Sequence, residues 1–213
     1  MCNDYRFTSY CKQFRDVALK KQTLDTRIRD EHRNTRIMYN QISKQESEYR
    51  NEFMKIYNFR CAYCGVSTEI LNIGLFEIDH FICKSSTLFS EEELGSLNNL
   101  VLACRCCNRN KRDHKWPIKY NSIFSPDNGE IANVFVRDEK YYIRIVDEYI
   151  SNPEVNAFYK KLQLGTQKRR LDYLIIEMCG FKKLLAQNPS NSGIIHQLNE
   201  CIYRLKNKRN LIC

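Results

Sequence analysis

Glycine and proline are scarce in this chain, with 7 and 4 copies among 213 residues. The first glycine is Gly65 and the first proline is Pro117, so the opening segment lacks the residues that interrupt helices most strongly. Apolar residues between Val17 and Ile56 recur mostly at steps of three and four, which is the period of an amphipathic helix. We therefore expect an N-terminal helical segment, and the polar cluster at residues 30–34 predicts a break between two helices.

Long hydrophobic runs are also absent. The longest are short pieces such as Leu100–Cys104, far below the roughly 18 consecutive apolar residues of a membrane span. The first residues, Met1–Arg6, are polar and contain no apolar segment of the kind found in a secretory signal peptide. We therefore expect no membrane association and a reducing, cytoplasmic location. A hydrophobic fraction of 43% is enough for a folded core, which excludes a disordered tail.

Acidic residues are the minority charge. The chain has 34 lysines and arginines against 25 acidic residues, a net charge of +9 that predicts a polyanionic partner. Residues 61–116 are nearly balanced, with 6 basic and 7 acidic residues. The basic residues of that segment gather in one strip after its last cysteine pair, which we interpret as a phosphate-binding surface: Arg105, Arg109, Lys111, Arg112 and Lys115. The clusters at residues 168–170 and 206–209 are interpreted as helix ends.

Cysteine, in contrast, is plentiful, with 11 copies. Four of them form two C-x-x-C pairs, Cys61 with Cys64 and Cys104 with Cys107. Two such pairs can deliver four thiolates to one tetrahedral ion, and zinc is the metal that such a set prefers. Two independent redox motifs, or buried thiols, are the alternatives. Cys106 is left over, because the step from Cys104 to Cys107 already has the spacing of a ligand pair.

The hydrophobic pattern predicts an α+β fold in three parts. An N-terminal helical segment (1–58) precedes a metal-pinned module (59–117), and a hairpin with helices (118–213) follows. In the module we expect strands at 76–81 and 99–103, a helical turn in the loop between them, and a helix at 108–114. In the last part we expect hairpin strands at 131–136 and 141–146, and helices at 153–164, from Thr166 to about 187, and at 192–208.

The residues between and after the cysteine pairs form a recognisable series. Asp79-His80 is followed by Asn99-Leu100, and then by the run Cys104-x-x-Cys107-Asn108-x-x-Lys111. Together with the first cysteine pair, this series resembles the zinc-ribbon subgroup of the HNH endonucleases over about a quarter of the chain. The resemblance implies a ββα-metal fold, in which two strands and a helix surround one divalent ion.

The resemblance also implies roles for individual residues. His80 would be the general base, and Asn99 would fix the loop that carries the base through a side-chain hydrogen bond. Asp79 and Asn108 would hold the catalytic ion, and Lys111 would contact the substrate backbone. Imidazole is a suitable base near neutral pH, and oxygen ligands suit Mg²⁺ or Mn²⁺, whereas thiolates suit zinc. We therefore expect two different metals in one module.

The predicted function is hydrolysis of DNA phosphodiester bonds to 5′-phosphate and 3′-OH ends. DNA is favoured over RNA because it is the usual substrate of the family. Similar small proteins suggest a restriction or anti-phage effector that acts with a partner subunit such as an ATPase. Two alternatives stay open: a zinc-ribbon nucleic-acid-binding protein without catalysis, and a scaffold subunit that depends on a partner. The chain departs from many members of that family at Cys83, where they have proline. Because Asn98 precedes Asn99, the match to the central asparagine of the family is ambiguous by one residue.

Overall fold

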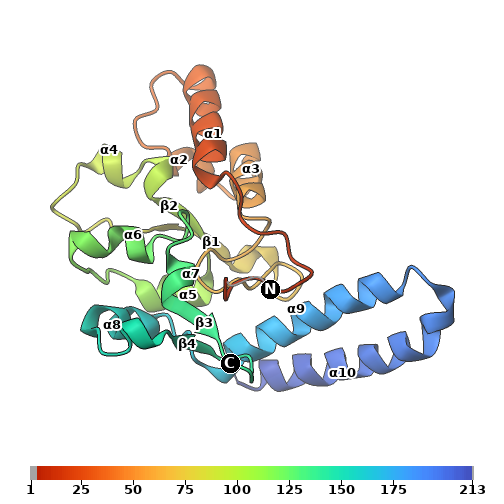
Figure 1. Cartoon of the computed structure of the whole chain (residues 1–213). Coiled ribbons are helices and arrows are strands. Elements are labelled where there is room, and N and C mark those ends of the chain that lie inside the picture. The colour runs from red at the N-terminus through yellow and green to blue at the C-terminus, as the bar shows by residue number, and fades with distance from the viewer. Residues whose placement is uncertain (1–3, 213) are drawn as a thin grey trace.

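The computed structural model describes residues 4–212 and has an α+β fold (Figure 1). It contains two small antiparallel sheets, β1 with β2 and β3 with β4. The α+β prediction is confirmed. The elements follow one another as α1 (Val17–Glu31), α2 (Tyr39–Ile42), α3 (Glu48–Ile56), β1 (Phe76–His80), α4 (Glu91–Leu94), β2 (Leu100–Cys104), α5 (Arg105–Lys111), α6 (Asn121–Phe124), α7 (Ile131–Val134), β3 (Phe135–Arg137), β4 (Ile143–Ile145), α8 (Pro153–Lys161), α9 (Gln167–Leu185) and α10 (Ser192–Asn210).

The N-terminal segment contains two main helices, as predicted. The buried residues of α1 follow steps of four and three, from Val17 to Ile28, and this face packs on α3. The first helix ends at Glu31, inside the predicted break. The break itself is longer than expected, because the chain forms the short helix α2 before α3 begins at Glu48.

The two strands of the middle segment pair in register, with Phe76 opposite Cys104 and His80 opposite Leu100. The predicted order of strand, loop, strand and helix is confirmed. The loop carries α4, which begins with a capping box between Ser90 and Glu93. Helix α5 begins directly after β2, three residues earlier than predicted. It also ends earlier, because Arg112 takes a φ of 48° that no helix can continue.

The hairpin after the module is shorter than predicted. Its strands are Phe135–Arg137 and Ile143–Ile145, and the backbone amides of Lys140 and Tyr142 donate to the Asp138 carboxylate in the turn. Residues Ile131–Val134 form the short helix α7 rather than the start of a strand, so that part of the prediction is wrong. Packing overrides the local β preference there, because Ile131 and Val134 are both buried in the core.

The last three helices have the predicted order. Asn152 caps α8 by accepting from the amides of Glu154 and Val155, and α8 ends before the positive φ of Gln163. Helices α9 and α10 pack on each other as an antiparallel hairpin that extends away from the body in Figure 1. No helix among residues 4–212 is both long enough and apolar enough to cross a membrane.

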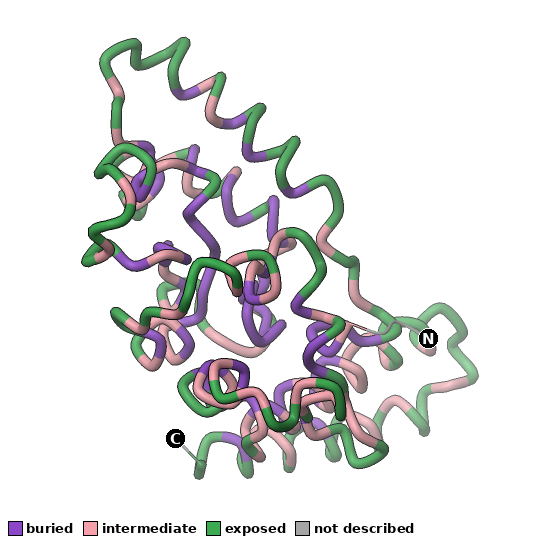
Figure 2. Tube along the Cα trace, turned by 60° about the vertical axis from the view of Figure 1, so that its left-hand side comes forward, coloured by how far each residue is buried: buried purple, intermediate pink, exposed green. Residues whose placement is uncertain are grey.

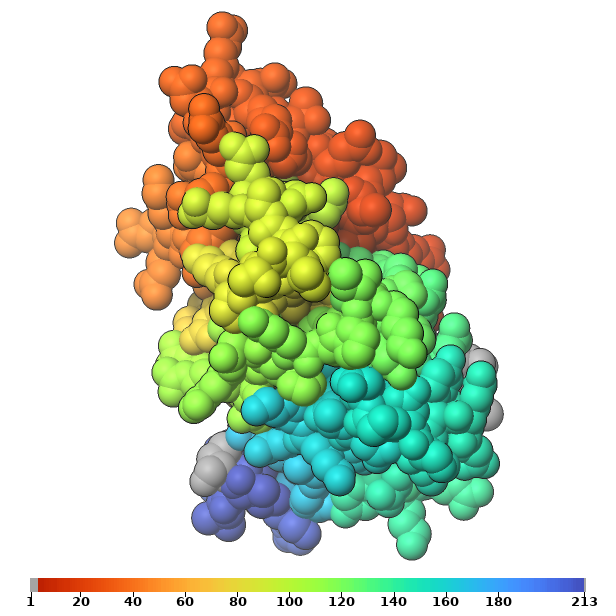
Figure 3. All heavy atoms as spheres, turned by 90° about the vertical axis from the view of Figure 1, so that its left-hand side faces the viewer, coloured from red at the N-terminus to blue at the C-terminus, as the bar shows by residue number. Residues whose placement is uncertain are grey.

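One hydrophobic core joins the three predicted segments. It contains buried residues from Tyr5 to Leu164, and buried positions lie mainly in the interior of the trace in Figure 2. In Figure 3 the segments stack in chain order, with the N-terminal helices at one end. The buried apolar residues of the α9–α10 hairpin, such as Leu171, Ile175 and Ile202, lie outside this core cluster. The hairpin is therefore attached to the body through other contacts.

Candidate functional site

The four predicted zinc ligands come together at one end of the β1–β2 sheet. Cys61 and Cys64 lie in a turn that is tied to β2, because the amide of Ala62 donates to the Leu102 carbonyl at 2.7 Å. The turn closes at Gly65, which has a φ of 76° and no room for a side chain, since a Cβ would lie 2.0 Å from the Arg6 carbonyl oxygen. Cys104 ends β2 and Cys107 lies in the first turn of α5.

The geometry of this cysteine cluster suits a tetrahedral zinc ion. The four sulfur atoms lie within 4.8 Å of one another and all four residues are buried. The sulfurs of Cys64 and Cys104 are 3.8 Å apart. Zinc–sulfur bonds of about 2.3 Å in a tetrahedron require sulfur separations of about 3.8 Å. The cluster can therefore hold a structural metal such as zinc, whereas no disulfide joins any of these cysteines.

The fifth cysteine of this region, Cys106, lies beside the cluster and is half-buried. Its sulfur is 3.6 Å from the side-chain amide of Asn110. Burial raises the pKa of the Cys64 and Cys107 thiols, whereas hydrogen bonds from neighbouring thiols lower the pKa of Cys104. Metal binding would deprotonate the whole set, because thiolates are the ligands.

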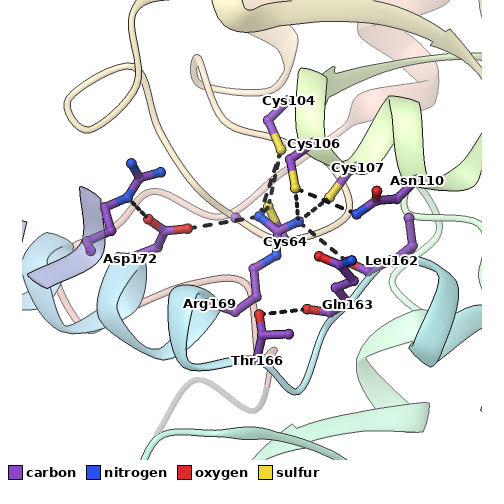
Figure 4. A network of polar contacts seen from close by, with 12 residues as sticks. Cys64, Cys104, Cys106, Cys107, Asn110, Leu162, Gln163, Thr166, Arg169 and Asp172 are labelled. Atoms are coloured by element: carbon purple, nitrogen blue, oxygen red, sulfur yellow. Dashed lines mark hydrogen bonds and ion pairs between the residues drawn. The ribbon is translucent and has the colours of Figure 1, made fainter. Parts of the chain in front are cut away.

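Arg169, at the start of α9, is a residue of this site that sequence reasoning missed. Its side chain is buried, and its guanidinium donates to the sulfurs of Cys64 at 3.2 Å and Cys107 at 3.1 Å (Figure 4). The basic cluster at 168–170 lies at a helix end, as predicted, because α9 begins at Gln167, but Arg169 is buried there rather than exposed. The hydrophobic period gives little signal for it, because a basic residue in the first turn of a helix is ordinarily exposed.

A row of polar side chains links β1 to α5. Glu77 and Asp79 lie on the same face of β1, and Arg105, Asn108 and Lys111 recur every third residue along α5. Glu77 accepts from Arg105 at 2.8 Å and from the Asn108 amide at 2.7 Å. One step further along, the Lys111 ammonium lies 3.2 Å from the Asp79 carboxylate.

Asp79 is held by two partners in the interior. Its other carboxylate oxygen accepts from the Tyr63 hydroxyl at 2.8 Å. Burial raises the pKa of Asp79 to about 6, although Lys111 and Tyr63 both favour the ionised form. Lys111 is only 1% exposed and also donates to the His80 carbonyl at 2.8 Å. The prediction that Lys111 contacts the substrate is therefore corrected, because its ammonium is buried against Asp79.

His80 is the last residue of β1 and directly follows Asp79. Its ring packs on the Tyr39 ring of α2, with centroids 4.5 Å apart. Its Nε2 atom is buried and has no hydrogen-bond partner among the described residues. Burial, with Lys84 and Lys111 nearby, lowers the pKa of His80 to about 4, so the imidazole is neutral at neutral pH. His80 and Lys84 line a cavity of about 370 Å³.

Asn99 fastens the loop that follows His80. Its side-chain oxygen accepts from the Ile82 amide at 2.8 Å, and its side-chain nitrogen donates to the carbonyls of Ile82 and Leu94 at 3.0 and 2.8 Å. This is the kind of contact that the resemblance assigns to the central asparagine. Asn98, its neighbour, is exposed, and Asn99 is the asparagine whose side chain bonds to the loop.

The remaining members of the basic strip lie at the surface. Arg109, Arg112 and Lys115 are exposed, and the Lys115 ammonium donates to the Ser85 carbonyl at 2.9 Å. Arg105 is partly exposed and carries the ion pair with Glu77. These four residues, without Lys111, are the part of the strip that a polyanion could reach.

Among residues 4–212, the cysteine cluster is the one group of three or more His, Cys, Asp or Glu side chains placed to hold a metal ion. A second ion would depend on Asp79 with the side-chain oxygen of Asn108. No protein-family model matches the chain, and no curated protein or solved structure matches it either.

Proposed function

We propose that the chain is a metal-dependent endonuclease of the HNH type that hydrolyses phosphodiester bonds of DNA to 5′-phosphate and 3′-OH ends. One observation carries the proposal. His80 lines a cavity and has a buried Nε2 atom without a hydrogen-bond partner among the described residues, beside a strand, loop, strand and helix that the cysteine cluster holds together at its other end. A buried polar atom without a partner is costly in a folded protein, so its presence in a residue that lines a cavity supports a role in binding or catalysis.

His80 can act as a general base. The imidazole is neutral at neutral pH, so Nε2 can accept a proton from an attacking water that reaches it, although a pKa of about 4 makes it a weaker base than a free imidazole. Asn99 holds the following loop by three hydrogen bonds, which fixes the end of β1 and with it the imidazole. Lys84 lies at the same cavity and brings a positive charge that favours a phosphate there.

Asp79 and Asn108 are the residues that would hold the catalytic ion. The Asn108 nitrogen is bonded to Glu77, which leaves its side-chain oxygen for a ligand role. Asp79 offers carboxylate oxygens, and hard oxygen ligands suit Mg²⁺ or Mn²⁺. Such an ion would stabilise the negative charge of the pentacoordinate phosphate and of the leaving oxygen. It would compete with Lys111 for Asp79, because the Lys111 ammonium already lies 3.2 Å from that carboxylate.

The partly exposed Arg105 and the exposed Arg109, Arg112 and Lys115 would contact the phosphate backbone, which positions a substrate without reading its sequence. A restriction or anti-phage effector that acts with a partner subunit, such as an ATPase, is the biological setting that we propose. DNA is proposed over RNA because DNA is the usual substrate of the family that the sequence resembles.

A second function is favoured by one observation. Both oxygens of Asp79 already have protein partners, Tyr63 and Lys111, as expected for a structural carboxylate. On that interpretation the chain is a zinc-ribbon protein that binds nucleic acid without cutting it. The two functions differ in whether His80 is needed for a covalent change in the DNA.

Plasmid nicking separates the two functions. Supercoiled DNA is incubated with the purified chain and Mg²⁺ or Mn²⁺, and the wild type is compared with His80→Ala. His196→Ala is the matched control, because His196 is exposed on α10. The nuclease proposal expects nicking by the wild type and the control and none by His80→Ala. Equal nicking by all three chains, or DNA binding without nicking by any, would contradict it.

A further inference from the structure

Arg169, which is buried at the cysteine cluster, is the first of a series of buried charged side chains. Asp172 lies one turn after Arg169 on α9, with its carboxylate 3.9 Å from the Arg169 guanidinium. The other oxygen of Asp172 accepts from Arg209 of α10 at 2.6 Å. All three residues are at most 5% exposed. Arg169, Asp172 and Arg209 therefore form a relay of alternating charge that runs from the sulfur atoms through α9 into α10. Figure 4 labels Arg169 and Asp172.

The burial of Arg169 requires negative charge on the sulfurs. A buried guanidinium is costly unless it is paired, and Asp172 already has a second, closer cation in Arg209. Neutral thiols are weak hydrogen-bond acceptors, and a disulfide carries no charge. Four thiolates around one zinc ion carry a net charge of −2, which the single excess positive charge of the relay partly neutralises. The relay therefore suits the metal-bound form of the cysteine cluster and fits neither free thiols nor disulfides.

This relay is also the buried polar link between the hairpin and the body. The apolar residues that α9 and α10 bury lie outside the main core cluster. Other polar contacts of the hairpin are exposed or partly buried, such as the bond from Arg170 to the Lys140 carbonyl, the ion pair of Lys183 with Glu69, and the bond of the Tyr142 hydroxyl to Gln167. Exposed contacts of this kind contribute little to stability, whereas breaking a buried charged pair is costly.

We propose that Arg169 couples the α9–α10 hairpin to the cysteine cluster, so that metal binding and docking of the hairpin stabilise each other. Arg169 acts as a positioning residue for the metal ligands, since it touches sulfur and not the ion. The coupling is reciprocal by thermodynamic necessity, so a variant that shifts the hairpin toward its undocked form weakens metal binding. The proposal holds whether or not the chain cuts DNA.

Zinc affinity of hairpin variants tests the coupling. The full chain is loaded with zinc and titrated with a chromogenic chelator, and Arg169→Met, Arg209→Met and Arg204→Met are compared with the wild type. Arg204 lies on the same helix as Arg209 but is exposed, so its variant is the matched control. Arg169→Met should weaken zinc binding by about tenfold or more, as loss of a hydrogen bond to a metal ligand usually does. Arg209→Met should weaken it by a smaller factor, of about threefold, and Arg204→Met should leave it unchanged.

Two results would overturn the proposal. One is wild-type zinc affinity in both Arg169→Met and Arg209→Met, and the other is an equal loss in Arg204→Met. If Arg169→Met does not fold, Arg209→Met decides alone, because Arg209 bonds to Asp172 rather than to the four cysteines of the cluster. A second measurement uses the wild type itself. Extraction of zinc should speed amide hydrogen exchange in α10 more than in α1, and equal protection of α10 with and without zinc would contradict the coupling.

Discussion

The two ends of the β1–β2 sheet hold their polar residues in different ways. The register places Cys104 opposite Phe76 at one end and Leu100 opposite His80 at the other, about 13 Å away along the strands. The cysteine cluster consists of four like ligands, and Arg169 is the charged side chain that contacts their sulfurs among residues 4–212. At the other end, Asp79 and Asn99 are already bonded to protein groups. The first end can therefore hold a metal ion, whereas at the second end protein groups already satisfy Asp79 and Asn99.

The largest expected effect comes from removing one ligand of the cysteine cluster. Cys104→Ser should reduce bound zinc from about one ion per chain to a small fraction, because a structural zinc site needs all four ligands. The free energy of unfolding should fall by roughly 5 kcal/mol or more, since metal binding is folding free energy. Metal analysis and thermal unfolding measure the two effects.

Cys106→Ser is the matched control for that change. Cys106 lies next to the cluster but outside the four sulfurs that come together. It should retain about one zinc ion per chain and nearly wild-type stability. If Cys104→Ser keeps its full zinc content and unfolds like the wild type, the four cysteines do not hold a structural zinc ion.

The next largest effect on stability is expected at the end of the β1–β2 sheet that carries Asp79. Lys111→Met removes the cationic partner of the buried Asp79 carboxylate and should lower the free energy of unfolding by about 3 kcal/mol. Adding Asp79→Asn to the same chain should restore part of the loss, because it removes the unpaired charge. Urea unfolding measures all of these chains. Lys115→Met is the control, because Lys115 is an exposed member of the same basic strip, and it should change the free energy of unfolding by less than about 0.5 kcal/mol. An equal loss in both lysine variants would contradict the burial of Lys111.

A smaller effect is expected at the loop after His80. Asn99→Ala removes three hydrogen bonds and leaves the Ile82 amide without its partner, which should cost about 2 kcal/mol. Hydrogen exchange of the Ile82 amide should rise in the same variant. Asn98→Ala is the control, since Asn98 is exposed and should tolerate the change. A larger loss for Asn98→Ala than for Asn99→Ala would reverse the assignment of the loop contact.

The contrast also explains how much the sequence predicts. The cysteine cluster is predictable because ligand type and the C-x-x-C step together define a metal knuckle whatever the rest of the fold. Strands β1 and β2 are predictable because their apolar residues are continuous or alternate. The partners of Asp79 are harder to predict from the sequence. The spacing of Arg105, Asn108 and Lys111 by three residues nevertheless places Lys111 on the face of α5 that meets β1.

Other features depend on contacts far apart in the chain. Arg169 is 62 residues from Cys107, and nothing near it in sequence indicates burial. Tyr39, which packs on His80, comes from a helix of four residues that has no clear period. Residues 131–134 have strand-forming side chains, yet tertiary packing makes them a helix. Local pattern predicts elements and ligand sets, whereas the groups that surround and tune them become visible only when distant segments meet.

The smallest expected effect lies at the surface beside α5 and depends on the proposed function. Arg109→Ala combined with Arg112→Ala should leave stability within about 0.5 kcal/mol of the wild type, because both side chains are exposed. It should weaken binding of duplex DNA by about tenfold and lower the slope of log affinity against log salt by about two, one for each lost phosphate contact. Fluorescence anisotropy across a salt series measures both. Arg204→Ala with Lys208→Ala, on exposed positions of α10, is the matched control. If the α10 double variant lowers the slope and the Arg109→Ala, Arg112→Ala double variant does not, DNA binds to the α9–α10 hairpin. The surface that contacts phosphate then lies on the hairpin that Arg169 joins to the cysteine cluster rather than beside His80.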